Sequence, residues 1–214
     1  SRSDQPVDVD FFRERIAAAA QLRRNLYPGD SAYRAIHGDG DGLPGLVVDR
    51  YGDYLSAQFL IPAMEQRRDL LVPLLVEQFA CKGIMNRSDA GVRALEGLPQ
   101  EKGLLWGSVP DPVVIREGQL EFAVSLEHGQ KTGSFLDQRE NREAAARYAR
   151  GRLLDCFSYN GGFALRLAPQ CETAEAVDIS GDAVARIRAN AARNKADSLE
   201  VREANVFDEL RRLE

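Results

Sequence analysis

The fold of this chain is decided by one stretch, Leu153-Leu154-Asp155-Cys156-Phe157-Ser158-Tyr159-Asn160-Gly161-Gly162-Phe163. Its apolar start predicts a short strand, and its two glycines predict a tight turn that opens a helix at about Phe163. Paired glycines also let the backbone approach a ligand closely, because no β-carbon stands in the way. The stretch alone is compatible with a ligand-binding turn and with a plain strand-to-helix connection.

The same order of strand, turn and helix continues downstream. A predicted strand ends in Asp178, a helix begins near Asp182, which we expect to cap it, and a third strand ends shortly before Asn205. The carboxyl ends of neighbouring strands in a doubly wound sheet meet at one edge. We therefore expect Asp178 to bind a ribose diol, and Asn205 with the amide of Val206 to contact an adenine ring.

Two features of the first turn indicate the class of cofactor. The Gly-x-Gly-x-x-Gly spacing that receives a pyrophosphate is absent, which argues against a nicotinamide or flavin dinucleotide. The turn follows Asp155, whose negative charge suits an ammonium-bearing ligand. S-adenosyl-L-methionine carries an ammonium and a sulfonium, so the charge pattern favours this cofactor.

A polar segment over residues 129–142 precedes the first strand and is rich in side chains that donate, accept and stack. One interpretation is a lid over the cofactor, with Lys131, Thr132, Phe135 and Arg139 among its contacts. The other is a solvated loop that leads into a helix over residues 137–150, with Asp137 as its N-cap. The sequence alone leaves both open.

The N-terminal half is expected to contain two helices and a β-hairpin. We expect a helix capped by Asp10 that buries Phe12, Ile16, Ala19 and Ala20 and ends before Pro28. Strands over residues 46–48 and 54–60 flank Gly52-Asp53, which suits a type II′ hairpin turn. A leucine-rich helical stripe from Leu70 to Phe79 is expected to be interrupted or kinked at Pro73.

A second hairpin is predicted from residues 113–115 and 120–126 across the turn Glu117-Gly118-Gln119. We place a domain boundary at Pro110-Asp111-Pro112. The expected class is α/β, with a central α+β hairpin-containing domain at residues 1–112 and a cofactor-binding domain at residues 113–214.

Composition narrows the functional classes. The chain has 214 residues, 44% hydrophobic and 29% charged, enough for a buried core. It has no apolar run long enough for a membrane span and no secretory signal, so we expect a cytoplasmic protein. The net charge of −5 argues against nonspecific nucleic-acid binding, which depends on positive charge. An RNA partner would need a local basic patch or another domain.

No metal site is expected. The three cysteines, Cys81, Cys156 and Cys171, lack zinc-site or disulfide spacing. The alternating acids Asp39 and Asp41 do not make a calcium loop, because leucine and proline follow where a ligand and a glycine are required.

Two long motifs together resemble the large-subunit (23S) ribosomal RNA cytosine-C5 methyltransferases. One runs from Lys131 to Arg142 and the other from Asp155 to Phe163; the hairpin over residues 42–52 is similar to that family's central domain. The resemblance implies an N-terminal PUA RNA-binding domain, a central domain and a class I, Rossmann-like methyltransferase domain with a seven-stranded sheet. It also implies S-adenosyl-L-methionine as cofactor and ribosomal RNA as partner.

The chain departs from that family pattern at both ends. No PUA domain precedes Ser1, and the later strands, the Asp-Pro-Pro motif and the catalytic cysteine are not found before Glu214. We therefore expect a cofactor-binding chain with no catalytic residue and no turnover by itself. Cys156 lies within a strand and is interpreted as a buried structural cysteine. Asn205 stands where family members often have aspartate, which an amide oxygen can replace as an acceptor.

The predicted cofactor-binding residues are Lys131, Thr132, Phe135, Arg139, Asp155, Phe157, Ser158, Tyr159, Asn160, Gly161, Gly162, Asp178, Ser180, Asn205 and Val206. Two other functions remain open: a class I methyltransferase acting on a different substrate, and a noncatalytic RNA-binding module. The sequence does not decide the oligomeric state, and a homodimer is one option.

Overall fold

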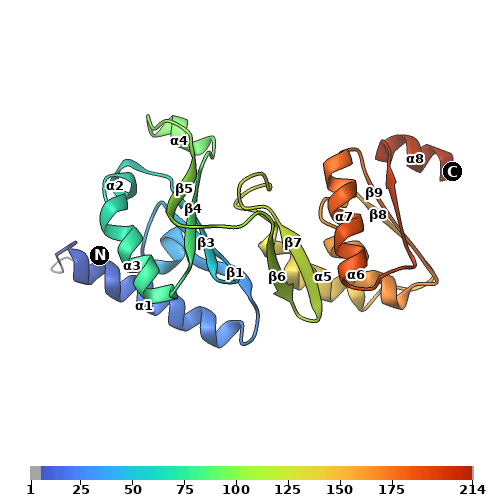
Figure 1. Cartoon of the computed structure of the whole chain (residues 1–214), viewed down its shortest axis with the longest axis horizontal. Coiled ribbons are helices and arrows are strands. Elements are labelled where there is room, and N and C mark those ends of the chain that lie inside the picture. Colours follow the sequence, from blue (N-terminus) through green and yellow to red (C-terminus); the bar gives the residue numbers. More distant parts are fainter. Residues whose placement is uncertain (1–5, 214) are drawn as a thin grey trace. The chain divides into compact units, whose positions relative to one another are not determined.

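The computed structural model describes residues 6–213, and these form two compact units (Figure 1). The first unit comprises Ser1–Ile115 and Ser125–Ser134, and the second comprises Arg116–Val124 and Phe135–Glu214. The division falls within strand β6 (Val113–Glu117), which forms a two-stranded sheet with β7 (Leu120–Val124). The second predicted hairpin is therefore confirmed. Each unit is described below by itself.

The first unit is built on a five-stranded sheet in the order β1-β2-β3-β4-β5. Only β3 and β4 pair in parallel; every other neighbouring pair is antiparallel. Its strands are β1 (Ala32–His37), β2 (Leu46–Tyr51), β3 (Tyr54–Phe59), β4 (Gly83–Ser88) and β5 (Glu101–Gly107). Its helical segments are α1 (Val9–Leu26), η1 (Gly38–Asp41), α2 (Pro62–Glu65), α3 (Arg68–Phe79) and α4 (Val92–Leu95).

The core of the first unit lies between the sheet and the helices α1 and α3. All four predicted core residues of α1, Phe12, Ile16, Ala19 and Ala20, are buried in it. Fully burying a side chain of isoleucine or phenylalanine size contributes about 1.5–3 kcal/mol, so this face holds the helix to the sheet.

Three sequence predictions for this unit need correction. The N-cap of α1 is Asp8, which accepts from the amide of Phe11, whereas Asp10 lies in the first turn and pairs with Arg13. Helix α3 runs without a break through Pro73, because packing of its leucines outweighs the one backbone hydrogen bond that proline cannot donate. The strands β1, β4 and β5 were not predicted.

The first hairpin is confirmed. Residues of β2 and β3 pair in register from Leu46↔Phe59 to Tyr51↔Tyr54, and Gly52 takes a φ of 62°. A glycine with positive φ at the first central position is what a type II′ turn requires.

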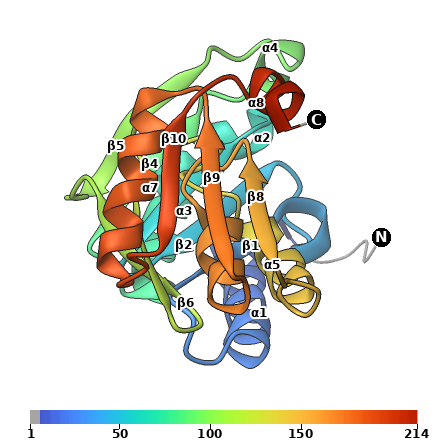
Figure 2. The same ribbon diagram turned by 90° about the vertical axis from the view of Figure 1, so that its right-hand side faces the viewer.

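The second unit contains a three-stranded parallel sheet in the order β10-β9-β8 (Figure 2). Its strands are β8 (Arg152–Cys156), β9 (Thr173–Asp178) and β10 (Leu199–Glu203). Its helical segments are η2 (Leu136–Gln138), α5 (Arg139–Ala146), α6 (Gly162–Leu167), η3 (Ala168–Gln170), α7 (Gly181–Arg193) and α8 (Val206–Leu213). The predicted order of strands and helices is confirmed, and with it the α/β class.

The cap of α7 differs from the prediction. Ser180 is the N-cap, and its side chain accepts from the amide of Ala183. Asp182 is the second residue of α7, where its negative charge interacts favourably with the helix dipole. Among the helices of residues 6–213, none is long and apolar enough to cross a membrane.

Candidate functional site

The candidate site lies at the carboxyl ends of β8, β9 and β10, which point to the same edge of the sheet (Figure 2). The register aligns Cys156 with Val177 and Asp178 with Glu203, so the three strands end side by side. This alignment brings the turn after β8, the acid that ends β9 and the segment after β10 together, as the sequence predicts.

Asp155 lies near the end of β8 and accepts hydrogen bonds from the turn and helix that follow. One of its carboxylate oxygens accepts from the hydroxyl of Ser158 and, at 3.0 Å, from the amide of Ala164. Burial raises the pKa of Asp155 above its ordinary value, and the nearby charge of Asp178 raises it further, against those two hydrogen bonds. A cationic ligand would offset this cost, because an opposite charge favours the ionised form.

The turn itself has an unusual backbone. Phe157, Tyr159 and Gly161 take positive φ values of 57°, 53° and 78°. Such conformations are strained for residues with a β-carbon and often occur at functional sites. The amide of Ser158 still donates to Val177, which fixes the turn to β9.

The two glycines have a packing role. A β-carbon on Gly161 would lie 3.1 Å from the Ile187 side chain, and one on Gly162 would lie 3.2 Å from the side chain of Arg142. Both glycines therefore allow close approach of protein side chains. Arg142 in turn makes a two-pronged ion pair with Glu117.

Asp178 is positioned by two backbone amides. Its oxygens accept from Tyr159 at 2.9 Å and from Ser180 at 3.0 Å. A carboxylate has about four acceptor positions, so two remain for a ligand. The carboxylate also ties the turn after β8 to the start of α7.

After β10, Asn205 caps α8. Its side-chain oxygen accepts from the amide of Phe207 at 2.9 Å, and its carbonyl accepts from Asp208 and Glu209. Val206 begins the helix and is buried. The predicted adenine contact therefore comes from a residue whose oxygen already has a backbone partner.

Tyr159 and Asn160 join the turn to neighbouring elements. Asn160 is buried; its side chain accepts from Arg186, and its carbonyl accepts from Asn190, both on α7. The guanidinium of Arg186 lies over the Tyr159 ring at 5.2 Å. The ring of Phe135 meets the Tyr159 ring edge to face at 5.5 Å, so one residue of the polar motif lies beside the turn.

Sequence reasoning named Phe157 at this edge but missed two other exposed apolar residues, Ile179 and Phe207. Phe157, Ile179 and Phe207 are 60%, 64% and 62% exposed, and the rings of Phe157 and Phe207 meet at 5.9 Å. Large exposed apolar side chains close together mark a surface that takes a ligand or partner. The available signal was that each apolar residue directly follows or nearly follows a predicted strand end.

The polar motif over residues 129–142 is divided between the units. Lys131 and Thr132 belong to the first unit, whereas Phe135 and Arg139 belong to the second. Arg139 begins α5 and pairs with Glu140 at 3.6 Å. The helix starts after the short η2, so Asp137 is not its N-cap and the predicted range of 137–150 shortens to Arg139–Ala146.

Cys81 and Cys156 are not activated. Cys156 is half-buried rather than buried; its pKa is raised by burial and by the acids Asp155 and Glu175. Burial also raises the pKa of Cys81. A raised pKa keeps a thiol protonated and unreactive. Within residues 6–213, no three histidine, cysteine or acidic side chains come together as a metal site.

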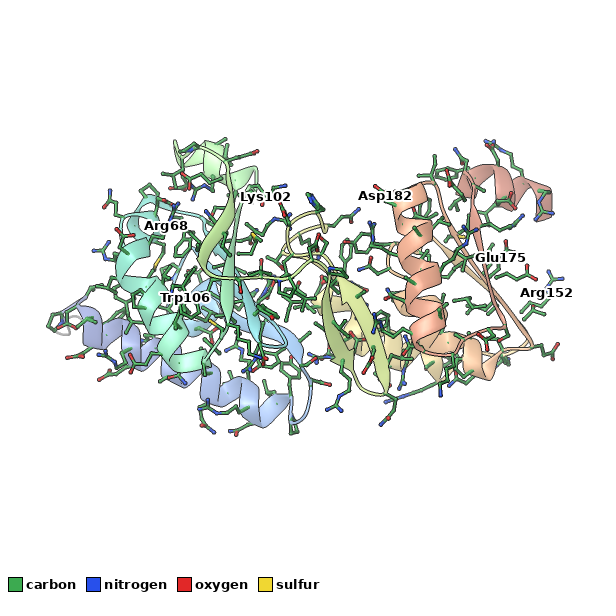
Figure 3. All side chains as sticks on the ribbon, in the orientation of Figure 1. Arg68, Lys102, Trp106, Arg152, Glu175 and Asp182 are labelled. Carbon is green, nitrogen blue, oxygen red and sulfur yellow. The ribbon has the colours of Figure 1, made fainter. Side chains whose placement is uncertain are left out.

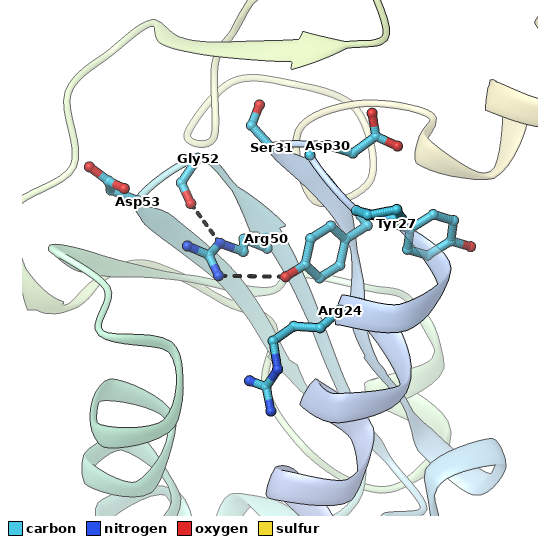
Figure 4. Close-up of a pocket in the computed structure, with 10 residues that line it drawn as sticks. Arg24, Tyr27, Asp30, Ser31, Arg50, Gly52 and Asp53 are labelled. Carbon is cyan, nitrogen blue, oxygen red and sulfur yellow. Dashed lines mark hydrogen bonds between the residues drawn. The ribbon is translucent and has the colours of Figure 1, made fainter.

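Two cavities lie away from the strand ends. One of about 320 Å³ in the first unit is lined by Arg24, Tyr27, Tyr33, Arg50 and Asp53, with Arg50 donating to the carbonyl of Gly52 (Figure 4). Its mixed charge favours neither an anion nor a cation.

The other cavity, of about 520 Å³, lies over the starting halves of the parallel strands. Arg152, Glu172, Glu175 and Glu200 line it (Figure 3 labels Arg152 and Glu175). Neither cavity includes a predicted site residue.

No family model matches the chain. Comparison with known proteins finds relatives that share one name. The chain is 40% identical over 218 residues to the ribosomal RNA large subunit methyltransferase I of Erwinia tasmaniensis, covering 99% of this chain and 55% of that protein. It is 42% identical to the protein of the same name from Shewanella denitrificans, covering 97% and 54%. The chain thus spans about half the length of these relatives.

Solved structures agree on the fold. A Streptococcus mutans protein assigned as a SAM-dependent methyltransferase matches with a TM-score of 0.84 at 25% identity, covering 99% of this chain and 56% of that one. A methyltransferase in complex with SAH matches with a TM-score of 0.83 at 24% identity and the same coverage. The chain therefore has the Rossmann-like fold of SAM-dependent methyltransferases.

We expect Asp155→Asn to fold at least as stably as the wild type. Because burial raises the folded-state pKa of Asp155, the ionised form costs folding free energy at neutral pH. This cost decreases as the pH falls below the raised pKa and is gone below the ordinary pKa of the unfolded chain. Asparagine carries no charge and keeps an acceptor for Ser158 and Ala164. Urea denaturation at pH 7 measures this; a clear loss of stability would contradict it.

Proposed function

We propose that this chain is the cofactor-binding part of an S-adenosylmethionine-dependent methyltransferase that modifies cytosine C5 of large-subunit ribosomal RNA. The observation that carries the proposal is the alignment of Asp155 and Asp178 at adjacent strand ends, each ordered by hydrogen bonds and with acceptor positions left for a ligand. The identity of about 40% to ribosomal RNA methyltransferases supports the substrate class.

Each strand end has a role in this proposal. Asp155 holds the ammonium of the cofactor, Asp178 accepts from the ribose hydroxyls, and the segment after β10 meets the adenine. Phe157, Ile179 and Phe207 supply the apolar surface that a purine face covers. The cofactor itself supplies an electrophilic methyl group. Lys131, Thr132, Arg139 and the other predicted residues complete the site as proposed contacts.

We also propose that the domains follow the sequence-based division, with residues 1–112 as the central domain and residues 113–214 as the cofactor-binding domain. RNA is the proposed partner of the whole protein. Because the chain is acidic overall, RNA binding must rely on local basic groups or on further parts of the protein.

Cytosine C5 methylation needs a thiolate that adds to C6 and makes C5 nucleophilic. The raised pKa values of Cys81 and Cys156 make both unsuitable, and Cys171 lies outside the site. We therefore propose that the 214-residue chain binds the cofactor without transferring the methyl group. Tritiated methyl transfer by the 214-residue chain to unmodified ribosomal RNA would contradict this part of the proposal.

The substrate is tested by mapping methyl groups on RNA after reaction with the full-length protein. Methylation at cytosine C5 of large-subunit ribosomal RNA is the expected result. Methyl groups on another base or another molecule would favour a different class I methyltransferase. Tight RNA binding without any binding of S-adenosylhomocysteine would favour a noncatalytic module.

We expect Asp178→Ala to weaken S-adenosylhomocysteine binding at least about tenfold, because a charge-assisted bond to the ribose is lost. Calorimetry on the folded variant measures the dissociation constant. Asp182→Asn is the matched control, since it removes an exposed carboxylate at the start of α7 that has no place in the site. An unchanged constant for Asp178→Ala removes this residue from the site.

Asp155→Asn should also bind at least about tenfold more weakly, because the ligand ammonium loses its counter-charge. Wild-type affinity should fall as the pH drops through the raised pKa of Asp155, since protonation neutralises the carboxylate. The variant should show no such fall. Titrations at a series of pH values test this, and parallel curves for the two proteins would rule Asp155 out as the charged contact.

In the full-length protein, Cys156→Ser should retain methyl transfer within about twofold, because a half-buried thiol with a raised pKa is not the nucleophile. Single-turnover assays on ribosomal RNA give the rate. Loss of transfer in a folded Cys156→Ser protein would identify Cys156 as catalytic and reverse this assignment.

A further inference from the structure

In the first unit, one face of β2 is polar and yet buried. Leu46 and Val48 point into the hydrophobic core, whereas Asp49 and Tyr51 lie on the opposite face, because side chains alternate along a strand. Asp49 is 1% exposed and Tyr51 is 0% exposed. Buried polar groups on a sheet face need partners from another segment.

Those partners come from Thr132 and Ser134, in the segment of residues 125–134, and lie 81 to 83 positions further along the chain. The Thr132 hydroxyl donates to Asp49 at 2.5 Å and lies 3.1 Å from the Tyr51 hydroxyl. The amide of Ser134 donates to the Tyr51 hydroxyl at 3.0 Å. Three bonds therefore fix two residues of the polar motif to the first hairpin.

The direction of the hydrogen bonds follows from a count of protons. Thr132 has one hydroxyl hydrogen and gives it to Asp49, so the hydrogen between Tyr51 and Thr132 must come from Tyr51. The order is then Ser134 amide to Tyr51, Tyr51 to Thr132, and Thr132 to the carboxylate. Burial and the charge of Asp49 raise the pKa of Tyr51 far above its ordinary value, so Tyr51 keeps the hydrogen it donates.

Two arginines add to the contacts of Asp49 and Tyr51 with Thr132 and Ser134. We call all of these contacts together the anchor of residues 125–134. Arg34 on β1 makes a two-pronged ion pair with Asp49, at 2.9 and 3.1 Å. Arg87 on β4 donates to the carbonyl of Leu126 at 2.9 Å, and Leu126 is fully buried. The segment is held at both ends.

Between these anchors, the backbone forms a tight turn. Gln130 and Gly133 form a bridge, and Lys131 takes a φ of 53° at the exposed tip. A β-carbon on Gly129 would lie 2.3 Å from the carbonyl oxygen of Ser125 and 2.4 Å from that of Gly133. The backbone of this turn therefore has little conformational freedom, and the anchor determines the position and direction of the Lys131 side chain.

We propose that Asp49 and Tyr51 are positioning residues of the cofactor site, which set the conformation of the Lys131–Ser134 turn without touching the ligand. The inference rests on the proposed function and on the assignment of Lys131, at the exposed tip of the turn, as a cofactor contact. It explains why two motifs far apart in sequence belong together: the hairpin ending in Asp49-Arg50-Tyr51-Gly52 supplies the acceptors for Thr132 and Ser134.

The test compares Tyr51→Phe with Tyr33→Phe in the 214-residue chain. Tyr33 is also a buried tyrosine of this sheet, but its hydroxyl accepts from Arg50 at 3.5 Å and not from the Lys131–Ser134 turn. Tyr51→Phe should bind S-adenosylhomocysteine about five- to tenfold more weakly, since two hydrogen bonds to the turn are lost. Limited trypsin digestion should cut faster after Lys131, with other cleavage sites unchanged. Tyr33→Phe should leave both readouts at the wild-type level.

A second variant and a stability measurement guard against a general loss of stability. Thr132→Val removes the bridging hydroxyl and should reproduce the faster trypsin cleavage after Lys131, and urea denaturation should show that Tyr51→Phe and Thr132→Val both remain folded. Equal affinity of the wild type and Tyr51→Phe would overturn the positioning role. No binding by the wild type would instead overturn the proposed function, and the positioning role with it.

Discussion

The second unit depends on the parallel pairing of β8, β9 and β10. Parallel pairing makes all three strands end at the same edge, and each end must then turn into a helix within a few residues. Backbone groups at such ends need partners, and Asp155, Asp178 and Asn205 supply them. The residues that complete the turns are thus the same residues that we propose as cofactor contacts.

The ionised carboxylate of Asp155 is unfavourable for folding, which suggests that it serves another purpose. Asp155 is surrounded by protein on most sides and has Asp178 nearby, so both influences disfavour its ionised form. A group of this kind contributes little to stability at neutral pH and gains most from a positively charged partner. The arrangement fits a binding role better than a structural one.

Much of this fold could be predicted from the sequence, since periodicity and glycine turns report local structure. The α1 face, both hairpins and the three parallel strands follow from such local signals. β4 could not be found this way, because Gly83–Ser88 is buried on both faces and includes Asn86 and Arg87, so it shows no alternation. The contact of Asp49 with Thr132 is equally invisible, because no local pattern links residues 83 positions apart.

Asn205 shows what an amide changes at a strand end. Its oxygen accepts from the amide of Phe207 and so serves the helix. The side chain also adds a pair of N–H donors to the edge of the sheet, which a carboxylate does not have. A purine ring nitrogen accepts such a bond, but an exocyclic amine does not. In the proposed site, asparagine at this position offers its N–H donors to the ring nitrogens of the adenine.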